Sequence, residues 1–198
     1  MTQAELKPRA NRRAFVARLL AAVPQALVVT GLGSASYDVF AAGDRDLNYY
    51  LWGAMGGAAP LGLGLALAQP RRSVVVITGD GEQLMGIGSL ATIAAKQPRN
   101  LSIVVLDNGH FGETGMQRSH SSLGTDLVAV AKGFGIADAF STDSLEGCDH
   151  VTRRILARDG VSFTQVFIDA DEPPRALPPR DGPFIKNRFR TALGLEPF

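Results

Sequence analysis

The sequence is short of cysteine, and this limits the chemistry it can support. Cys148 is the one cysteine among 198 residues, so the chain cannot form an internal disulfide. A single thiol also cannot hold a zinc ion or an iron–sulfur cluster by itself. Such sparing use of cysteine is typical of a reducing compartment, and we therefore expect a cytoplasmic protein.

The sequence also lacks an excess of charge of one sign. Its 20 Lys and Arg residues against 19 Asp and Glu residues give a formal net charge of +1. A balance this even favours neither a nucleic acid nor an acidic membrane surface as a partner. We therefore expect no nucleic acid and no membrane among the binding partners.

Long apolar runs are missing as well. The longest apolar stretch, residues 53–68, is interrupted by glycines and a proline, and it is too short for a good membrane span. The first residues, MTQAELKPRANRRAF, place no apolar run after their charges, so we expect no secretory signal. With 45% hydrophobic and 20% charged residues, the composition is that of a globular domain with a sizeable core.

Apolar runs and amphipathic segments alternate along the chain. Strands are expected at 26–31, 47–52, 73–81, 101–108 and 163–170. Helices are expected at 9–22, 34–42, 56–69, 84–96, 125–134 and 144–158. The run SVVVITGDG is β-branched on both faces, which favours a central parallel strand covered from both sides. The alternation predicts an α/β fold with a doubly wound parallel sheet and helices on both faces.

The chain changes character after residue 170. The segment EPPRALPPRDGPF is proline-rich, and we expect that it continues neither a helix nor a central strand. The sequence therefore predicts an α/β domain over residues 1–170. Residues 171–198 are expected to form a proline-rich tail that packs on this domain or on a partner.

Three predicted strands end in residues suited to binding. These ends are Thr30-Gly31, Gly79-Asp80-Gly81 and Asp107-Asn108-Gly109. Ligands of open parallel sheets bind outside the carboxyl ends of the strands. A carboxylate between two glycines is expected to be exposed, and the first amides of the following helix favour an anion.

An anion beside a carboxylate indicates a phosphate-bound metal ion, usually magnesium. Asp80 and Asn108 are expected on neighbouring strand ends, where they and a nearby carbonyl could hold this ion. The Gly-Asp-Gly triplet alone also occurs at ordinary turns. Together with Asn108 at the end of the next strand, it resembles the signature of the thiamine-diphosphate-dependent enzymes, and Asp107 stands where that family often has a first asparagine.

The resemblance implies a set of cofactor residues. Magnesium would be held by the side chains of Asp80 and Asn108 and by the carbonyl of His110. The residues implied at the cofactor are Gly31, Gly53, Met55, Gly79, Asp80, Gly81, Glu82, Asn108, His110 and Gly112.

The stretch LWGAMGGAAPLGLGLALA resembles the part of the family that meets the aminopyrimidine ring. By this resemblance the carbonyl of Gly53 would accept from the 4-amino group, and Met55 would hold the cofactor bent. A helix of small residues packed on a sheet is the alternative interpretation. In the loop GETGMQRSHSS, Glu113 and His120 are the implied catalytic residues, because loops at this place close over substrate in the family.

More narrowly, the segments GDRDLNYYLWGAMG and GSLATIAAKQPRNLSIVVLDNGHFGETGMQ resemble sulfopyruvate and phosphonopyruvate decarboxylases. The implied protein is the small subunit of a 2-oxo-acid decarboxylase that uses thiamine diphosphate and magnesium. A separate pyrimidine-binding (alpha) subunit would supply the activating glutamate in a hetero-oligomer. A carboligase of the acetolactate synthase kind, a 2-oxoacid oxidoreductase subunit and a non-catalytic regulatory subunit with the same fold remain alternatives.

Overall fold

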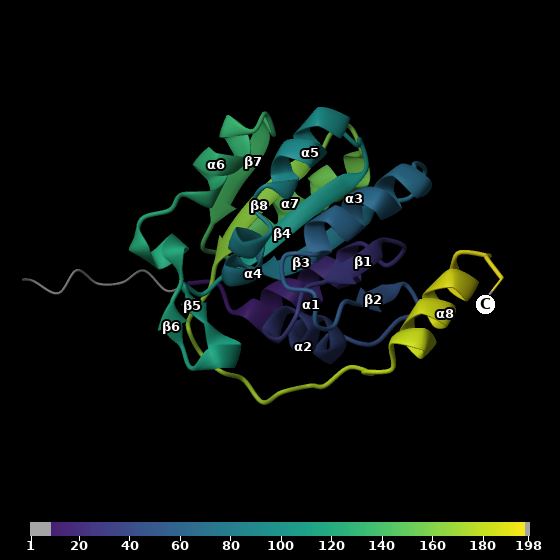
Figure 1. Cartoon of the computed structure of the whole chain (residues 1–198), viewed down its shortest axis with the longest axis horizontal. Coiled ribbons are helices and arrows are strands. Elements are labelled where there is room, and N and C mark those ends of the chain that lie inside the picture. Colours follow the sequence, from purple (N-terminus) through teal and green to yellow (C-terminus); the bar gives the residue numbers. More distant parts are fainter. Residues whose placement is uncertain (1–8, 197–198) are drawn as a thin grey trace, which may run out of the picture.

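The computed structural model describes residues 9–196, and within them a six-stranded parallel sheet forms the centre of the molecule (Figure 1). The strand order is β2-β1-β3-β4-β8-β7. The strands are β1 (Leu27–Thr30), β2 (Asn48–Tyr50), β3 (Val74–Gly79), β4 (Leu101–Asp107), β7 (Asp138–Thr142) and β8 (Ser162–Phe167). The first eight residues of the predicted 1–170 domain and residues 197 and 198 of the predicted tail lie outside the described residues.

Helices cover both faces of the sheet. One face carries α1 (Arg12–Ala22), α2 (Ser34–Ala41) and α7 (Gly147–Ala157), and the other carries α3 (Ala58–Ala68), α5 (Ser89–Lys96) and α6 (Leu127–Gly133). Alternate residues of a strand point to opposite faces, so Val75 and Ile77 join the first core while Val74 and Val76 join the second. The predicted doubly wound α/β fold is therefore confirmed.

The single helix predicted at 84–96 is wrong. Strand β3 ends at Gly79, not at residue 81, and a short helix α4 (Asp80–Met85) follows it directly, before α5 begins at Ser89. The break falls at Gly86, where an added Cβ would lie 2.2 Å from the carbonyl oxygen of Gly56. The chain therefore turns where two backbone segments touch.

Strand β7 and helix α8 (Gly182–Ala192) were not predicted. Strand β7, with the sequence DAFST, pairs in parallel with β8 at the edge of the sheet. Only one of its residues is buried, so it lacks the apolar run of a central strand. Helix α8 begins with the last three residues of the proline-rich segment, whose residues 172–181 are neither helix nor strand, so the expectation for this segment fails only at its end. Proline is tolerated in a first helical turn, and the side chain of Asp181 caps the helix by accepting from the amide of Phe184.

Within this chain the C-terminal segment packs against β2. The Nε1 of Trp52 donates to the carbonyl of Pro179 at 2.8 Å, and Arg188 pairs with Asp44 at 2.6 Å. Figure 1 shows the segment running beneath α2 before α8 reaches the edge of the sheet.

The carboxyl ends of β1, β3 and β4 lie side by side at one edge of the sheet. Beyond β4 the chain forms the antiparallel pair β5 (His110–Phe111) and β6 (Gln117–Arg118), with 3-10 turns at Gly112–Thr114 and His120–Leu123. No helix among the described residues is both long and apolar enough to cross a membrane.

Candidate cofactor site

A cavity of about 390 Å³ opens at the carboxyl ends of β3 and β4. Its wall contains nine of the twelve predicted site residues. These are Met55, Gly79, Asp80, Gly81, Glu82, Asn108, His110, Gly112 and Glu113. Residues that are distant in the sequence thus meet around one space large enough for a small-molecule ligand.

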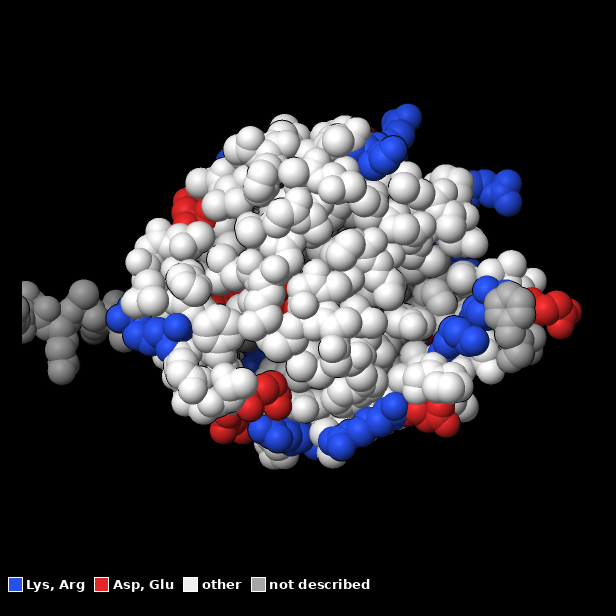
Figure 2. Space-filling view, in the orientation of Figure 1, with Lys and Arg blue, Asp and Glu red and all other residues white. Residues whose placement is uncertain are grey.

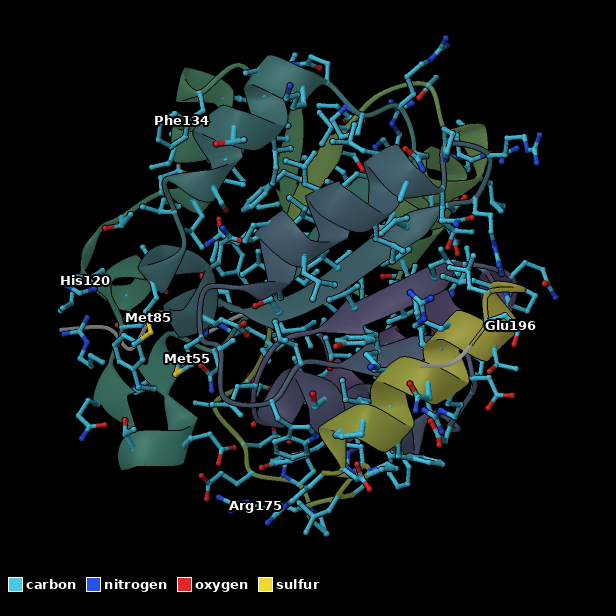
Figure 3. The ribbon with its side chains drawn as sticks, turned by 45° about the vertical axis from the view of Figure 1, so that its right-hand side comes forward. Met55, Met85, His120, Phe134, Arg175 and Glu196 are labelled. Carbon is cyan, nitrogen blue, oxygen red and sulfur yellow. The ribbon has the colours of Figure 1, made fainter. Side chains whose placement is uncertain are left out.

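Three predicted site residues do not line this cavity. Gly31 is buried beneath Glu82, whose Oε2 lies 1.5 Å from the position that a Cβ on Gly31 would take. Gly53 is exposed on the loop that leads to Met55. His120 is exposed and is not among the residues that line the cavity, and Figure 3 shows it at the outer edge of the molecule. The roles predicted for these three residues stay predictions.

Asp80 was expected to be exposed, and this expectation is wrong. Its carboxylate is buried because the segment after β6 folds over the end of β3. The hydroxyl of Ser119 donates to its Oδ2, and the hydroxyl of Ser121 lies 3.1 Å from the same atom. Burial, followed by the charge of nearby Asp107, raises the pKa of Asp80 to about 6.

Asp107 is held by other groups and does not line the cavity. Its Oδ1 accepts from the amide of Gly109 at 2.8 Å and lies 2.9 Å from the hydroxyl of Ser121. Its Oδ2 accepts from the Nε2 of Gln165 at 2.6 Å. The hydroxyl of Ser121 therefore lies between the carboxylates of Asp80 and Asp107, and it ties the two strand ends together.

Asn108 and His110 form a tight turn at the cavity wall. The amide of His110 donates to Oδ1 of Asn108 at 2.9 Å, and the His110 ring lies 2.8 Å from the Asn108 carbonyl through Nδ1. Among the described residues no three His, Cys, Asp or Glu side chains gather as metal ligands. An ion here would use amide and carbonyl oxygens with Asp80, and oxygen ligands of this kind suit magnesium.

Glu82 joins α4 to the turn after β1. Its Oε2 accepts from the amide of Leu32 at 3.0 Å and from the hydroxyl of Thr78 at 2.9 Å. Burial raises the pKa of Glu82, and these hydrogen bonds partly oppose the effect. The residue thus fixes one wall of the cavity.

Two methionines stand at the mouth of the cavity. Met55 and Met85 both line it, and Figure 3 shows their side chains on the same side of the molecule. They are 40% and 59% exposed, which is high for apolar side chains. The contact between Gly56 and Gly86 holds their two segments together, so the position of Met55 depends on the break between α4 and α5.

The sequence analysis did not identify Arg12 and Ser34, which also line the cavity. Arg12 is 4% exposed, and its Nε donates to Oδ2 of Asp38 at 2.7 Å. Nothing in the sequence distinguishes Arg12 from its neighbour Arg13, because both belong to a segment that predicts an amphipathic helix with an arginine-rich face. The difference arises only when α1 packs on α2.

Comparison with known proteins gives the class of this chain. The model of the C-terminal thiamine pyrophosphate-binding domain of thiamine pyrophosphate enzymes matches residues 31–166. The chain belongs to this family, and it is a thiamine diphosphate-binding domain.

Among curated proteins, the chain is 44% identical to phosphonopyruvate decarboxylase of Streptomyces viridochromogenes, over 81% of this chain and 40% of that enzyme. It is 34% identical to sulfopyruvate decarboxylase subunit beta of Methanococcus maripaludis, over 92% of this chain and 97% of that subunit. The chain thus spans about two fifths of the first relative and nearly the whole of the second.

Among solved structures, the chain resembles the thiamine diphosphate-dependent 4-hydroxybenzoylformate decarboxylase of Rhodococcus jostii RHA1 with a TM-score of 0.70. The identity is 20%, and the match covers 87% of this chain and 35% of that one. At this identity the likeness concerns the fold alone.

Proposed function

We propose that this chain is the small subunit of a two-chain 2-oxo-acid decarboxylase that uses thiamine diphosphate and magnesium. The observation that carries the proposal is the meeting of Asp80, Asn108 and His110 at one cavity in a thiamine diphosphate-binding domain. The match to nearly the full length of a subunit named sulfopyruvate decarboxylase beta supports the two-chain arrangement.

In this proposal the side chains of Asp80 and Asn108 and the carbonyl of His110 hold magnesium. The backbone of Gly79, Gly81 and Gly112 borders the same cavity, where small residues leave room for a diphosphate. Because Ser119 and Ser121 hold the Asp80 carboxylate in this structure, Asp80 must exchange hydrogen bonds for a metal bond when the ion binds.

When bound, thiamine diphosphate would supply the nucleophilic carbon and the electron sink that decarboxylation of a 2-oxo acid requires. The chain's own residues position and shield the reaction. Met55, at the mouth of the cavity, holds the rings in place, and Glu113 faces the cavity from the loop after β5. His120 acts on the substrate only if the loop that carries it moves inward.

The partner would cover the face that carries the cavity mouth. Figure 2 shows that charged side chains gather at the rim of this face, while its centre over α3, α4 and α5 is largely uncharged. Met55, Leu67 and Met85 are exposed by 40%, 51% and 59%. Exposed apolar surface of this kind favours burial against another chain. The partner is a pyrimidine-binding subunit that contributes the activating glutamate.

The test is reconstitution. The purified chain, with magnesium, thiamine diphosphate and a panel of 2-oxo acids, should turn over about 100- to 10,000-fold more slowly alone than with its partner subunit, because acid–base assistance is missing. Aldehyde and carbon dioxide are the expected products, and a 2-hydroxy ketone would indicate a carboligase instead.

Asn108→Ala should abolish magnesium-dependent cofactor binding in the complex, whereas Asn108→Asp, which keeps an oxygen ligand, should retain part of it. Full turnover by the chain without any partner would refute the two-chain proposal. Unchanged cofactor affinity in Asn108→Ala, measured by calorimetry, would refute the metal site.

A further inference from the structure

We propose that Arg12 is an anion-binding residue at the cavity wall, and that it contacts the diphosphate of the cofactor. This inference rests on the proposed function for the identity of the anion. It concerns a residue on an element outside the 31–166 region that matches the family model. The argument uses the position of Arg12, its charge balance and its neighbours.

The start of α1 is fixed at the carboxyl end of the sheet. Ala10 forms a parallel bridge with Ile168, and the Nη1 of Arg9 donates to the carbonyl of Ile168 at 3.2 Å. Asn11 caps the helix by accepting from the amide of Ala14. Arg12 is therefore the first helical residue, and it lines the main cavity from the α1 side of the sheet.

The position of Arg12 is electrostatically unfavourable without a ligand. The first turn of a helix favours acidic side chains, and α1 has none there, whereas Arg12 and Arg13 both lie in it. One carboxylate, that of Asp38, faces both guanidinium groups, at 2.7 Å from Arg12 and 3.4 Å from Arg13. Asp38 is shared between the two guanidinium groups, and Arg13 is 31% exposed to solvent whereas Arg12 is only 4% exposed, so the buried charge of Arg12 is the costly one.

Arg12 also has donors to spare. Only its Nε is engaged by Asp38, and its Nη nitrogens make no hydrogen bond to any residue in the described part of the chain. The side chain is nevertheless 96% enclosed, given its 4% exposure, and it borders both the main cavity and a smaller neighbouring one. A guanidinium group with free donors at a cavity suits a phosphate oxygen.

The neighbours of Arg12 favour an anion at the same place. Ser34 and Ala35, the first residues of the eight-residue helix α2, line the cavity beside it. The N-cap of α2 is Gly33, which has no side chain to cap the helix, so the first amides remain free for an anion. The carboxylate of Glu113 already packs against Gly33, where its Oε1 would lie 2.8 Å from an added Cβ.

The rest of the cavity wall explains why one arginine matters. The wall also contains the carboxyl groups of Asp80, Glu82 and Glu113, and Arg12 is the one lysine or arginine among the described residues that line it. A diphosphate keeps a net negative charge even with one magnesium ion bound. Without Arg12, an acidic wall would meet an anionic ligand and repel it.

The competing explanation is that Arg12 only ties α1 to α2 through Asp38. Four variants separate the two roles: Arg12→Gln, Arg12→Lys, Arg13→Gln and Asp38→Asn. Arg13 is the matched control, because it is the adjacent arginine, shares the same carboxylate and does not line the main cavity. Asp38→Asn removes the tie but keeps the guanidinium group of Arg12.

The measurement is calorimetric titration of the full chain with magnesium and inorganic pyrophosphate, repeated with thiamine diphosphate and with thiamine. Arg12→Gln should weaken pyrophosphate and thiamine diphosphate about 10- to 100-fold, as expected for a charged hydrogen bond, and leave thiamine unchanged. The affinity of Arg12→Lys for pyrophosphate and thiamine diphosphate should lie between those of Arg12→Gln and the wild type. The pyrophosphate affinity of Arg13→Gln should stay within about twofold of the wild-type value. Asp38→Asn should still bind pyrophosphate, although its unfolding temperature should be lower.

Wild-type pyrophosphate affinity in Arg12→Gln, together with a lower unfolding temperature, would overturn the proposal and leave only the tie to Asp38. A loss confined to the KM of an anionic 2-oxo acid would assign Arg12 to the substrate and overturn its contact with the diphosphate. The proposed function fails separately: if Asn108→Ala keeps wild-type cofactor affinity, the metal site is wrong, while the pyrophosphate titration still decides the role of Arg12.

Discussion

Replacing Asp80 with asparagine should stabilise the chain when no metal is present and should prevent magnesium-dependent binding of the cofactor. The carboxylate is buried beside Asp107, and burial and this neighbouring charge raise the pKa of Asp80 to about 6 from an ordinary value of 3.8. Asparagine has nearly the same shape, keeps an oxygen for the hydroxyls of Ser119 and Ser121, and carries no charge. The substitution therefore removes the cost of the charge with little change in packing.

The size of the effect follows from linkage. A pKa raised in the folded state from 3.8 to about 6 corresponds to about 3 kcal/mol at 1.36 kcal/mol for each pKa unit. Since the raised value means that folding favours the protonated form, this contribution of Asp80 is fully present below pH 4 and is lost as the pH rises through about 6. Asp80→Asn should thus gain up to about 3 kcal/mol over the wild type above pH 7, and little at pH 4.

The assay is urea unfolding of both proteins between pH 4 and 8 in a chelating buffer. With magnesium, thiamine diphosphate and the partner present, the wild type should become more stable to urea than Asp80→Asn, because these ligands bind and stabilise only the folded wild type. Exposed Asp143, changed to asparagine, is the control and should show no such pH dependence. A difference between Asp80→Asn and the wild type that is constant with pH, or a destabilisation at pH 8, would refute the reasoning.

Three further predictions concern other parts of the chain. Gly86→Ala places a methyl carbon 2.2 Å from the backbone oxygen of Gly56, so it should lower the free energy of unfolding in urea by about 1–3 kcal/mol. Gly88→Ala is the control, because a Cβ there meets nothing within 4 Å, and it should change the free energy of unfolding by less than about 0.5 kcal/mol. Cys148 is fully buried and burial raises the pKa of its thiol, so iodoacetamide at pH 7 should label it only on unfolding; rapid labelling of the native chain would contradict its packing. Removal of α8 and the segment before it should shift the emission of Trp52, the single tryptophan, to longer wavelength; an unchanged spectrum would show that the segment does not cover it.

The parts of the fold that could be predicted are those whose signal is local. Val74–Ile77 and Ile103–Leu106 are apolar on both faces, and both became central strands. The residues that end these strands, Asp80 and Asn108, are brought to one cavity because neighbouring parallel strands end at the same edge of the sheet.

The parts that could not be predicted depend on contacts between distant residues. Asp80 is buried by Ser119 and Ser121, which lie about forty positions later, and the Gly-Asp-Gly triplet alone carries no trace of them. Arg12 is buried because α1 packs on α2, where its Nε donates to Asp38. Helix α8 depends on the cap at Asp181. The prolines before Asp181 favour an irregular segment, so no helix was predicted there.

Helix α8 has a consequence for how the sheet meets other chains. An open strand edge offers unpaired backbone groups to any passing strand and so invites intermolecular pairing. At β2 this edge is covered: Arg188 donates to the outward carbonyl of Asn48 at 3.4 Å, and α8 reaches both cores of the sheet through Ile185 and Phe189. The C-terminal helix thus leaves less of the β2 edge open to strand pairing with another chain.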